Sequence, residues 1–456
     1  MNKMKIFNTF SKLKEEFIPI EANKVRMYVC GQTVYDYCHL GHARKAVAFD
    51  MIRRWFIASG YKVTYVENIT DIDDKIIIRA IENNESIWQL TKRFINYMHE
   101  DFFKLGVLRP DIEPKATDYI PQMIKIIEEL IKKGYAYLAL NGDVYYSIKK
   151  FTNYGKLSGK SLKDLRMGER VEIDPNKNDP MDFVLWKSSK ENEPYWDSPF
   201  GKGRPGWHIE CSAMAEKLLG KNFDIHGGGQ DLLFPHHENE IAQSEAHNNC
   251  KFANYWLHNG FLNINDEKMS KSLGNFSTIR EVLNEHNSEV VRFFMLKTHY
   301  RSPLNFNSKI LEEAKHSLTR LYTSIKNYSN SSLTNIDWNN EFANRFKKAM
   351  DDDFNTPLAI SVLFELVSEI NKHADLKLVN LLISLANTIG ILEKSPVDFL
   401  QDGNKISVEE IESLIKKREE ARQNKNFQLA DKIRQDLLNN NIVLEDNLGI
   451  TTWRKG

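Results

Sequence analysis

The stretch from residue 25 to residue 66 constrains the fold more than any other part of the chain. A run of β-forming residues at 25–30 ends at Gly31, and a second such run follows at 62–66. Between them, residues 43–59 carry apolar side chains at helical spacing. A strand, a helix and a second strand in this order form a parallel α/β unit, so we predict a Rossmann-like α/β fold.

The rest of the chain predicts an insertion and two further parts. Residues 120–205 mix a helical run, hairpin-like runs and loops rich in Gly, Pro and Lys, and the α/β pattern resumes near Phe223. Long amphipathic helices follow, and a charged helix pair with a short β-rich end closes the chain. We therefore predict a split Rossmann-like nucleotide-binding catalytic domain, a helical bundle and a small C-terminal module. The expected boundaries are 1–119 and 206–305 for the two catalytic halves, 120–205 for the connective insertion, 306–400 for the helical bundle and 401–456 for the terminal module.

Composition excludes several classes of protein. Lys plus Arg and Asp plus Glu both number 62, so net charge gives no sign of a nucleic-acid partner, which would need basic side chains gathered on one face. No apolar run is long enough to cross a bilayer, and the N-terminus lacks the pattern of a secretory signal, so we expect a cytoplasmic protein without membrane contact. The four cysteines are too few and too scattered for a disulfide framework, which leaves free thiols or metal ligands.

A short polar motif stands where the first strand enters the helix. In His39-Leu40-Gly41-His42, the glycine lets a phosphate approach the backbone, while helix N–H groups and two imidazoles face it. Far along the chain, Lys268-Met269-Ser270-Lys271-Ser272 places two lysines where the negative charge of a leaving pyrophosphate would develop. We predict ATP binding by His39, Gly41, His42 and Lys271, and a catalytic role in charge stabilisation for His39, His42, Lys268 and Lys271.

Each motif alone is weak, because a two-histidine tetrapeptide and a basic loop both occur by chance. Together, and in this order on either side of a nucleotide-binding fold, they resemble the HIGH and KMSKS motifs of class I aminoacyl-tRNA synthetases. The one departure is Leu40 in place of the usual isoleucine, an apolar exchange of similar volume. The resemblance implies adenylate formation from ATP and Mg²⁺ without a protein nucleophile.

Cysteine, histidine and acidic residues offer a candidate metal site. Two thiolates, one imidazole and one carboxylate form a set that Zn²⁺ binds tetrahedrally. His236 and Glu240 are four residues apart, so on a helix they share one face, whereas His237 and Glu238 point elsewhere. Spacing alone leaves Cys38 open as a ligand, and it also leaves open the ordinary burial of free cysteines.

Longer segments resemble the cysteinyl-tRNA synthetases almost from end to end. The zinc-bearing segments of that family are similar to residues 30–36, 206–214 and 234–240, and further family segments to residues 68–75 and 108–111. The resemblance implies activation of L-cysteine with ATP and its transfer to the 3′-terminal ribose of tRNA(Cys). It implies one Zn²⁺ per chain on Cys30, Cys211, His236 and Glu240, and a cysteine pocket with Trp207, His226 and Asp231.

The chemistry of cysteine explains why such an enzyme needs a metal. Serine has almost the same shape, and packing alone rejects an isostere only modestly. Zinc binds a thiolate at about 2.3 Å, whereas a hydroxyl competes poorly. The metal would therefore sense the side chain, and no editing domain is required.

The C-terminal segment is expected to read the anticodon. It carries many basic residues, yet acidic residues interleave with them, a pattern that is also typical of a solvated helix. The resemblance to the anticodon-reading end of cysteinyl-tRNA synthetases favours tRNA contact by Arg418, Arg422, Trp453 and Arg454, with Trp453 as a stacking surface. We expect the chain to act as a monomer.

Three other functions stay open on sequence alone. A ligase that joins cysteine to a sugar amine in mycothiol synthesis shares the catalytic fold and zinc site but lacks a full anticodon-binding extension. A zinc-dependent hydrolase would use His236, His237, Glu238 and Glu240, but it would have no use for the lysine loop. An inactive tRNA-binding homologue would not be expected to keep all three catalytic segments intact.

Overall fold

The structure is a computed structural model of the 456-residue chain. It describes residues 3–160, 175–265, 267–268, 277–328, 330–402, 408–440, 442–447 and 450–455, with the backbone alone at Lys268, Val408, Asn447 and Ile450. Among the helices of these residues, none combines the length and the apolar character that crossing a membrane requires.

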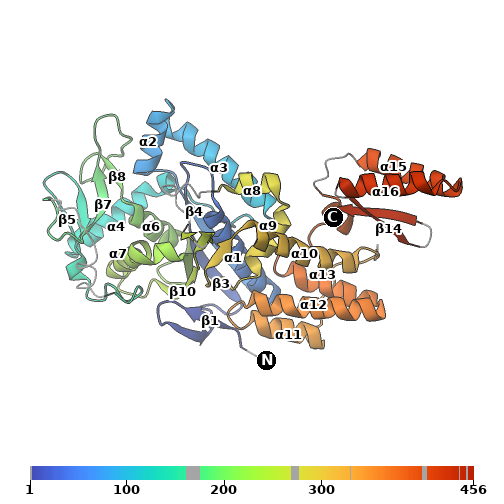
Figure 1. The fold of residues 1–456 in the computed structure, drawn as a ribbon. Coiled ribbons are helices and arrows are strands. Elements are labelled where there is room, and N and C mark those ends of the chain that lie inside the picture. Colours follow the sequence, from blue (N-terminus) through green and yellow to red (C-terminus); the bar gives the residue numbers. More distant parts are fainter. Residues whose placement is uncertain are drawn as a thin grey trace.

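A four-stranded parallel sheet forms the centre of the catalytic part (Figure 1). Helix α1 (Leu40–Ala58) connects two neighbouring strands of this sheet, which confirms the predicted strand, helix and strand. The third strand begins at the predicted restart of the α/β pattern and is buried along nearly its whole length, as expected when both faces of a sheet are covered. The strand order is β10 (Ala253–Asn259), β9 (Phe223–Gly229), β3 (Lys24–Thr33) and β4 (Lys62–Thr70).

Two glycines allow the close packing of this sheet. A Cβ atom at Gly31 would lie 1.5 Å from the carbonyl oxygen of Asn68, so only glycine lets β3 and β4 approach here. A Cβ atom at Gly227 would lie 2.3 Å from the ring of Phe49 on α1. Both positions are next to functional residues, so the same packing fixes Cys30 and His226 in place.

The chain between β4 and β9 contains the predicted insertion. The helix expected near its start and the hairpin after it are both confirmed, and two more short strands complete an antiparallel sheet in the order β5-β6-β7-β8. The elements of this stretch are α2 (Asp74–Glu82), α3 (Ile87–Lys104), α4 (Ile120–Lys132), β5 (Ala136–Leu138), β6 (Val144–Tyr146), β7 (Phe183–Ser188), β8 (Gly203–Pro205) and α6 (Trp207–Leu219).

Short elements complete the catalytic part. An N-terminal hairpin precedes the sheet, and a π-helical turn, η4, leads into α7. These elements are β1 (Lys5–Asn8), β2 (Leu13–Glu16), η3 (Gln230–Leu232), η4 (Leu233–His237), α7 (Glu238–Asn248), β11 (Leu262–Ile264), β12 (Glu267–Lys268), α8 (Ile279–Glu285), α9 (Ser288–Leu296) and β13 (Leu304–Phe306).

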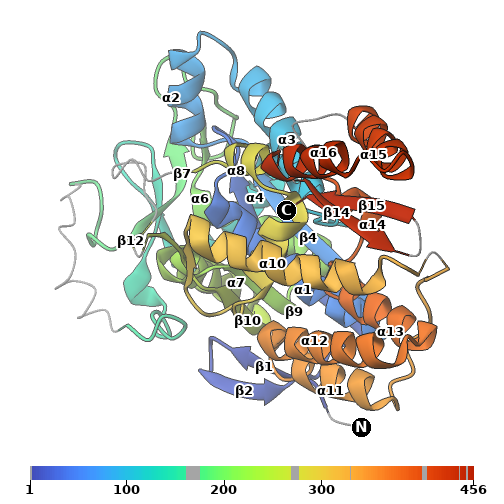
Figure 2. The ribbon, with the colours of Figure 1, turned by 45° about the vertical axis from the view of Figure 1, so that its right-hand side comes forward.

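The C-terminal third has two parts with separate cores. The helices α10 to α14 share one continuous hydrophobic core with the catalytic part, whereas the last elements pack around a small core of their own, which includes Ile415, Leu437 and Trp453. Figures 1 and 2 show α15, α16 and β14 gathered beside the helical part. The elements are α10 (Ser308–Ile325), α11 (Glu341–Met350), α12 (Thr356–His373), α13 (Leu376–Asn387), α14 (Pro396–Leu400), α15 (Val408–Gln423), α16 (Phe427–Asn439), β14 (Ile442–Asn447) and β15 (Ile450–Lys455). The five residue boundaries predicted above stay a prediction.

Candidate metal centre and active site

Four buried side chains from four different elements meet at the base of the catalytic part. They are Cys30 on β3, Cys211 on α6, His236 on η4 and Glu240 on α7. The Sγ atom of Cys211 lies 3.6 Å from Cys30 Sγ and 3.6 Å from His236 Nε2. The Oε1 atom of Glu240 lies 3.1 Å from His236 Nε2 and 3.4 Å from Cys30 Sγ. We call these four residues the metal group.

The spacing of the metal group suits a tetrahedral ion. Zinc bonds of about 2.0–2.3 Å place tetrahedral ligand atoms roughly 3.3–3.8 Å apart. The observed separations of 3.1 to 3.6 Å lie close to that interval. Two sulfurs, one nitrogen and one oxygen are also the donor types that a borderline-soft divalent metal accepts. The residues therefore fit a metal ion in both geometry and chemistry.

The electrostatics of the metal group favour the deprotonated forms of Cys211 and Glu240. Burial lowers the pKa of His236, but Glu240 and Cys211 outweigh burial and raise this pKa to about 10. Burial raises the pKa of Cys211, but hydrogen bonds with Cys30 and His236 outweigh burial and lower this pKa to about 6. Burial likewise raises the pKa of Glu240, yet His226 and His236 hold it well below its usual range. In contrast, burial raises the pKa of Cys30 well above its ordinary value. A bound cation would stabilise all of the anionic forms together.

Further buried contacts orient the ligand atoms. His226 Nε2 lies 2.8 Å from Glu240 Oε2, and His208 Nδ1 lies 2.9 Å from His236 Nδ1. The Lys45 ammonium donates to the carbonyl oxygen of Cys30 at 2.9 Å. Such outer contacts fix the tautomers and orientation of metal-binding residues.

Sequence reasoning missed His208 and Lys45. His208 stands one helical turn before Cys211, and this spacing is a signal that could have identified it. Lys45 follows the two-histidine motif on α1, but only the fold brings it next to the carbonyl oxygen of Cys30.

The expectation that His237 points away from the metal group is wrong. Its Nε2 lies 4.0 Å from Glu240 Oε1, and His237 belongs to a second buried group with Cys30, His226 and Glu240. The reason is that His237 and Glu240 are three residues apart, and positions i and i+3 of a helix also share one face.

The structure also places Glu238 and Cys38, the two other residues considered as ligands in the sequence. Glu238 does point elsewhere, as expected, and accepts hydrogen bonds from the backbone N–H groups of Gly155 and Ser158, both at 2.9 Å. Cys38 lies outside both candidate metal groups of the described residues, and burial raises its pKa to about 12. Cys38 is therefore not a ligand in this arrangement.

A cavity of about 470 Å³ beside the metal group brings together six of the predicted site residues. Trp207 covers the metal group, with its ring centre 4.2 Å from that of His236. His226 does not line the cavity, because its imidazole is buried against Glu240. Lys268 contributes the backbone end of β12, and Lys271 lies outside the described residues. The predicted residues that line the cavity are Cys30, His39, Gly41, His42, Trp207 and Asp231.

The N-terminus of α1 forms another side of this cavity. Gly41 N donates to His39 Nδ1 at 3.1 Å, and His39 N donates to His42 Nδ1 at 3.2 Å. Because both Nδ1 atoms accept a backbone N–H, each neutral ring carries its proton on Nε2. Nε2–H donors beside a helix N-terminus favour a phosphate group.

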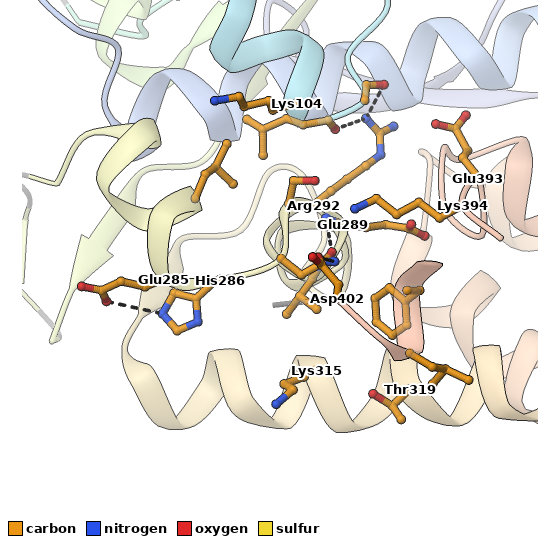
Figure 3. Close-up of a pocket in the computed structure, with 18 of the residues that line it drawn as sticks. Lys104, Glu285, His286, Glu289, Arg292, Lys315, Thr319, Glu393, Lys394 and Asp402 are labelled. Atoms are coloured by element: carbon orange, nitrogen blue, oxygen red, sulfur yellow. Dashed lines mark hydrogen bonds and ion pairs between the residues drawn. The ribbon is translucent and has the colours of Figure 1, made fainter. Parts of the chain in front are cut away.

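A larger cavity, of about 700 Å³, lies where α9, α10 and α14 meet (Figure 3). Its side chains carry both signs of charge, and several are engaged within the protein: Arg292 pairs with Asp50, and Glu289 accepts from Tyr322 at 2.7 Å. Neither candidate metal group lies in its lining. The smaller cavity lies beside the metal group and contains predicted site residues, so it is the candidate functional site in spite of its smaller volume.

Of the four residues predicted to contact tRNA, two are buried and two are at least partly exposed to solvent. Arg418 is buried and forms two hydrogen bonds with Asp446, at 2.9 and 2.8 Å, which hold the pKa of Asp446 well below its usual range. Trp453 is 4% exposed, so the prediction that it offers a stacking surface is wrong. The cause is that α15 and α16 need an apolar partner of their own, and Trp453 supplies it. Arg422 is half-exposed and Arg454 is partly exposed, so both can reach a ligand.

Comparison with known families and proteins agrees with this site. The family described as "tRNA synthetases class I (C) catalytic domain" matches residues 16–316, more than half of the chain, and the family described as "DALR domain" matches residues 345–393. A protein of Laribacter hongkongensis named "Cysteine--tRNA ligase" is 60% identical over 454 residues, which cover 99% of each chain. A protein of the same name from Cupriavidus necator is 60% identical over 462 residues, which cover 100% of each chain.

Solved structures share the fold at low sequence identity. A Mycobacterium tuberculosis methionyl-tRNA synthetase in complex with methionyl-adenylate has a TM-score of 0.57 at 13% identity, covering 80% of this chain and 89% of that one. A LeuRS-tRNA-LeuAMS ternary complex from Agrobacterium radiobacter K84 has a TM-score of 0.56 at 11% identity, covering 82% of this chain and 84% of that one. At these identities the likeness shows the fold alone.

The metal group predicts different effects for two cysteine substitutions. Cys211→Ser removes a buried ligand, so we expect the affinity for bound metal to fall by more than about tenfold. Cys250→Ser is the matched control, because Cys250 is exposed and lies outside both candidate groups. Elemental analysis of the dialysed proteins measures the difference, and full metal occupancy in Cys211→Ser would remove this residue from the site.

Proposed function

The chain belongs to the cysteine--tRNA ligase family of class I aminoacyl-tRNA synthetases, and from this premise we propose that zinc on its metal group selects L-cysteine for attachment to tRNA(Cys). As an aminoacyl-tRNA ligase it joins the amino acid to ATP as an adenylate and then transfers it to tRNA. The observation that carries the proposal is the buried metal group at the base of a cavity whose other side carries the His39 and His42 pair.

In the proposed site, Cys30, Cys211, His236 and Glu240 hold the ion. Zinc bound there would supply a Lewis acid that prefers a thiolate to a hydroxyl. Trp207, whose ring lies tilted against that of His236 and which is 40% exposed, forms the wall over the amino-acid side chain. Asp231 lines the same cavity and can pair with the ammonium group of the substrate. His226 acts through Glu240 rather than by contact with the substrate.

The phosphate side of the reaction depends on preorganised donors. His39 and His42 present Nε2–H groups, and α1 adds the positive end of its dipole, where negative charge develops on the α-phosphate and pyrophosphate. The predicted roles of Lys268 and Lys271 at the leaving pyrophosphate complete this picture, with Mg²⁺ accompanying ATP. No side chain of the cavity has to act as a nucleophile, because the substrate carboxylate attacks. We also propose that the enzyme acts as a monomer.

The rival functions lose their support. A hydrolase would need Glu238 as a free base, but its two carboxylate oxygens accept backbone N–H groups in the interior. A ligase for a small sugar amine would have no use for the separate terminal module, which here has its own hydrophobic core.

Amino-acid-dependent ATP–pyrophosphate exchange tests the proposal. We expect exchange with L-cysteine and a rate with L-serine that is lower by more than about a thousandfold, because packing alone gives ratios of at most about two hundred. Charging of tRNA(Cys) then tests the second step. Exchange that is equally fast with serine, or that is unchanged after the metal has been removed, would contradict zinc-based selection.

Truncation after Asp402 tests the role of the terminal module. The main core ends at Leu400 and does not include residues of the module, so we expect the shortened chain to fold and to keep cysteine-dependent exchange. Its charging of tRNA(Cys) should fall at least about tenfold, equivalent to about 1.4 kcal/mol of lost binding free energy. The ratio of charging to exchange, compared with that of the intact chain, is the quantity to measure. Equal ratios would show that the module does not contribute to tRNA recognition.

A further inference from the structure

A clamp around Arg280 joins separate segments beside the proposed ATP site. Arg280 lies in the first turn of α8, and its guanidinium carbon is 4.6 Å from the ring centre of Tyr37 and 4.4 Å from that of Tyr97. Tyr37 lines the functional cavity, whereas Tyr97 belongs to α3. A planar guanidinium stacks on aromatic rings in a way that a lysine ammonium does not reproduce. Arg280 therefore supports the cavity wall from behind.

A buried carboxylate holds the same guanidinium. Arg280 Nη2 donates to Asp101 Oδ1 at 3.0 Å and to the carbonyl oxygen of Tyr97 at 3.3 Å. The Asp101 side chain has no exposure to solvent, whereas 27% of the Arg280 side chain is exposed. A buried carboxylate needs such a partner, since an unpaired buried charge is strongly unfavourable. The ion pair therefore joins α3 and α8 at this point.

Backbone contacts connect α8 to the start of α1 next to this clamp. Thr278, which caps α8, forms an antiparallel bridge with His39. The N–H of Ile279 donates to the carbonyl oxygen of Cys38 at 2.8 Å. Tyr37 and His39 lie on the same loop between β3 and α1, so the clamp and the bridge hold this loop at two points.

We propose that Arg280 is a positioning residue for adenylate formation, because it holds the Tyr37 loop against α3 and α8 and thereby fixes His39 where the phosphates of ATP bind. This inference rests on the proposed function and concerns its phosphate side alone. A displacement of about 1 Å near the reacting groups costs on the order of a hundredfold in rate. Arg280 contacts Tyr37, Tyr97 and Asp101 rather than the metal group on β3, α6, η4 and α7, so we expect its loss to affect the reaction rate more than the binding of metal or cysteine.

The test compares Arg280→Gln with Arg93→Gln in the full-length, metal-loaded protein. Arg93 is a control in the same aromatic cluster on α3. It stacks at 5.2 Å on Phe94, whose ring packs against that of Tyr37 at 5.4 Å. Its two hydrogen bonds, however, go to Glu85 rather than to a residue that joins α3 to α8. Cysteine-dependent ATP–pyrophosphate exchange is measured over a range of ATP and cysteine concentrations, together with metal content.

We expect Arg280→Gln to lower the maximal exchange rate by ten- to a hundredfold, on the order of what misplaced groups cost, with the KM for cysteine and the metal content unchanged. Arg93→Gln should change the rate by less than about twofold, and Arg280→Lys should fall between the two. Tyr97→Leu, which removes one stacking face, should slow exchange, whereas Tyr97→Phe should not.

Folding of the variants is controlled separately. Arg280→Gln combined with Asp101→Asn leaves no unpaired buried carboxylate, so it serves as the test protein if the single variant does not fold. The inference would be overturned by a native exchange rate in Arg280→Gln or in the double variant, or by a loss of rate no larger than that of Arg93→Gln. A loss of bound metal in parallel with the loss of rate would also overturn it. If the native chain itself gave no cysteine-dependent exchange, the proposed function would fail and the inference with it, which distinguishes the two failures.

Discussion

The catalytic part depends on the burial of four ionisable side chains at one point. Two thiols, an imidazole and a carboxylate without access to water are strongly unfavourable unless they share a cation or pair with each other. One strand and three helical segments each deliver one of them, so these elements cannot shift independently. Because β3 carries Cys30 and runs directly into the loop that carries His39, the same strand fixes both the metal group and the proposed site for phosphate.

The sequence predicted those elements whose formation depends on interactions between residues that are near one another in the chain. The β3–α1–β4 unit followed from residue periodicity, and the Cys, His and Glu ligand types followed from zinc chemistry together with a family resemblance. His237 was misplaced because only the i,i+4 pair of His236 and Glu240 was considered, although the i,i+3 spacing also brings His237 to Glu240. Lys45 could be recognised as a partner of the ligands only once the fold had brought it there, whereas the helical spacing of His208 and Cys211 was a signal that the sequence already carried.

The terminal module shows a second limit of sequence reasoning. Its mixed charges are compatible both with a solvated helix pair and with a surface for tRNA, and a small domain must first build a core. Trp453 and Arg418 serve that purpose, as a core aromatic residue and as the partner of Asp446. We propose that recognition of tRNA falls to more exposed basic residues such as Arg422, together with the helical part that matches the DALR domain.

The central claim, that a metal on the buried group distinguishes cysteine from serine, is tested most directly by calorimetric titration of both amino acids. The full-length protein would be titrated in its metal-loaded form and again after removal of the metal by a chelator, with circular dichroism as the control for folding. We expect the loaded form to bind cysteine at least about a hundredfold more tightly than serine, and the stripped form to bind the two alike. Cysteine binding of equal affinity in the loaded and stripped forms would contradict the claim.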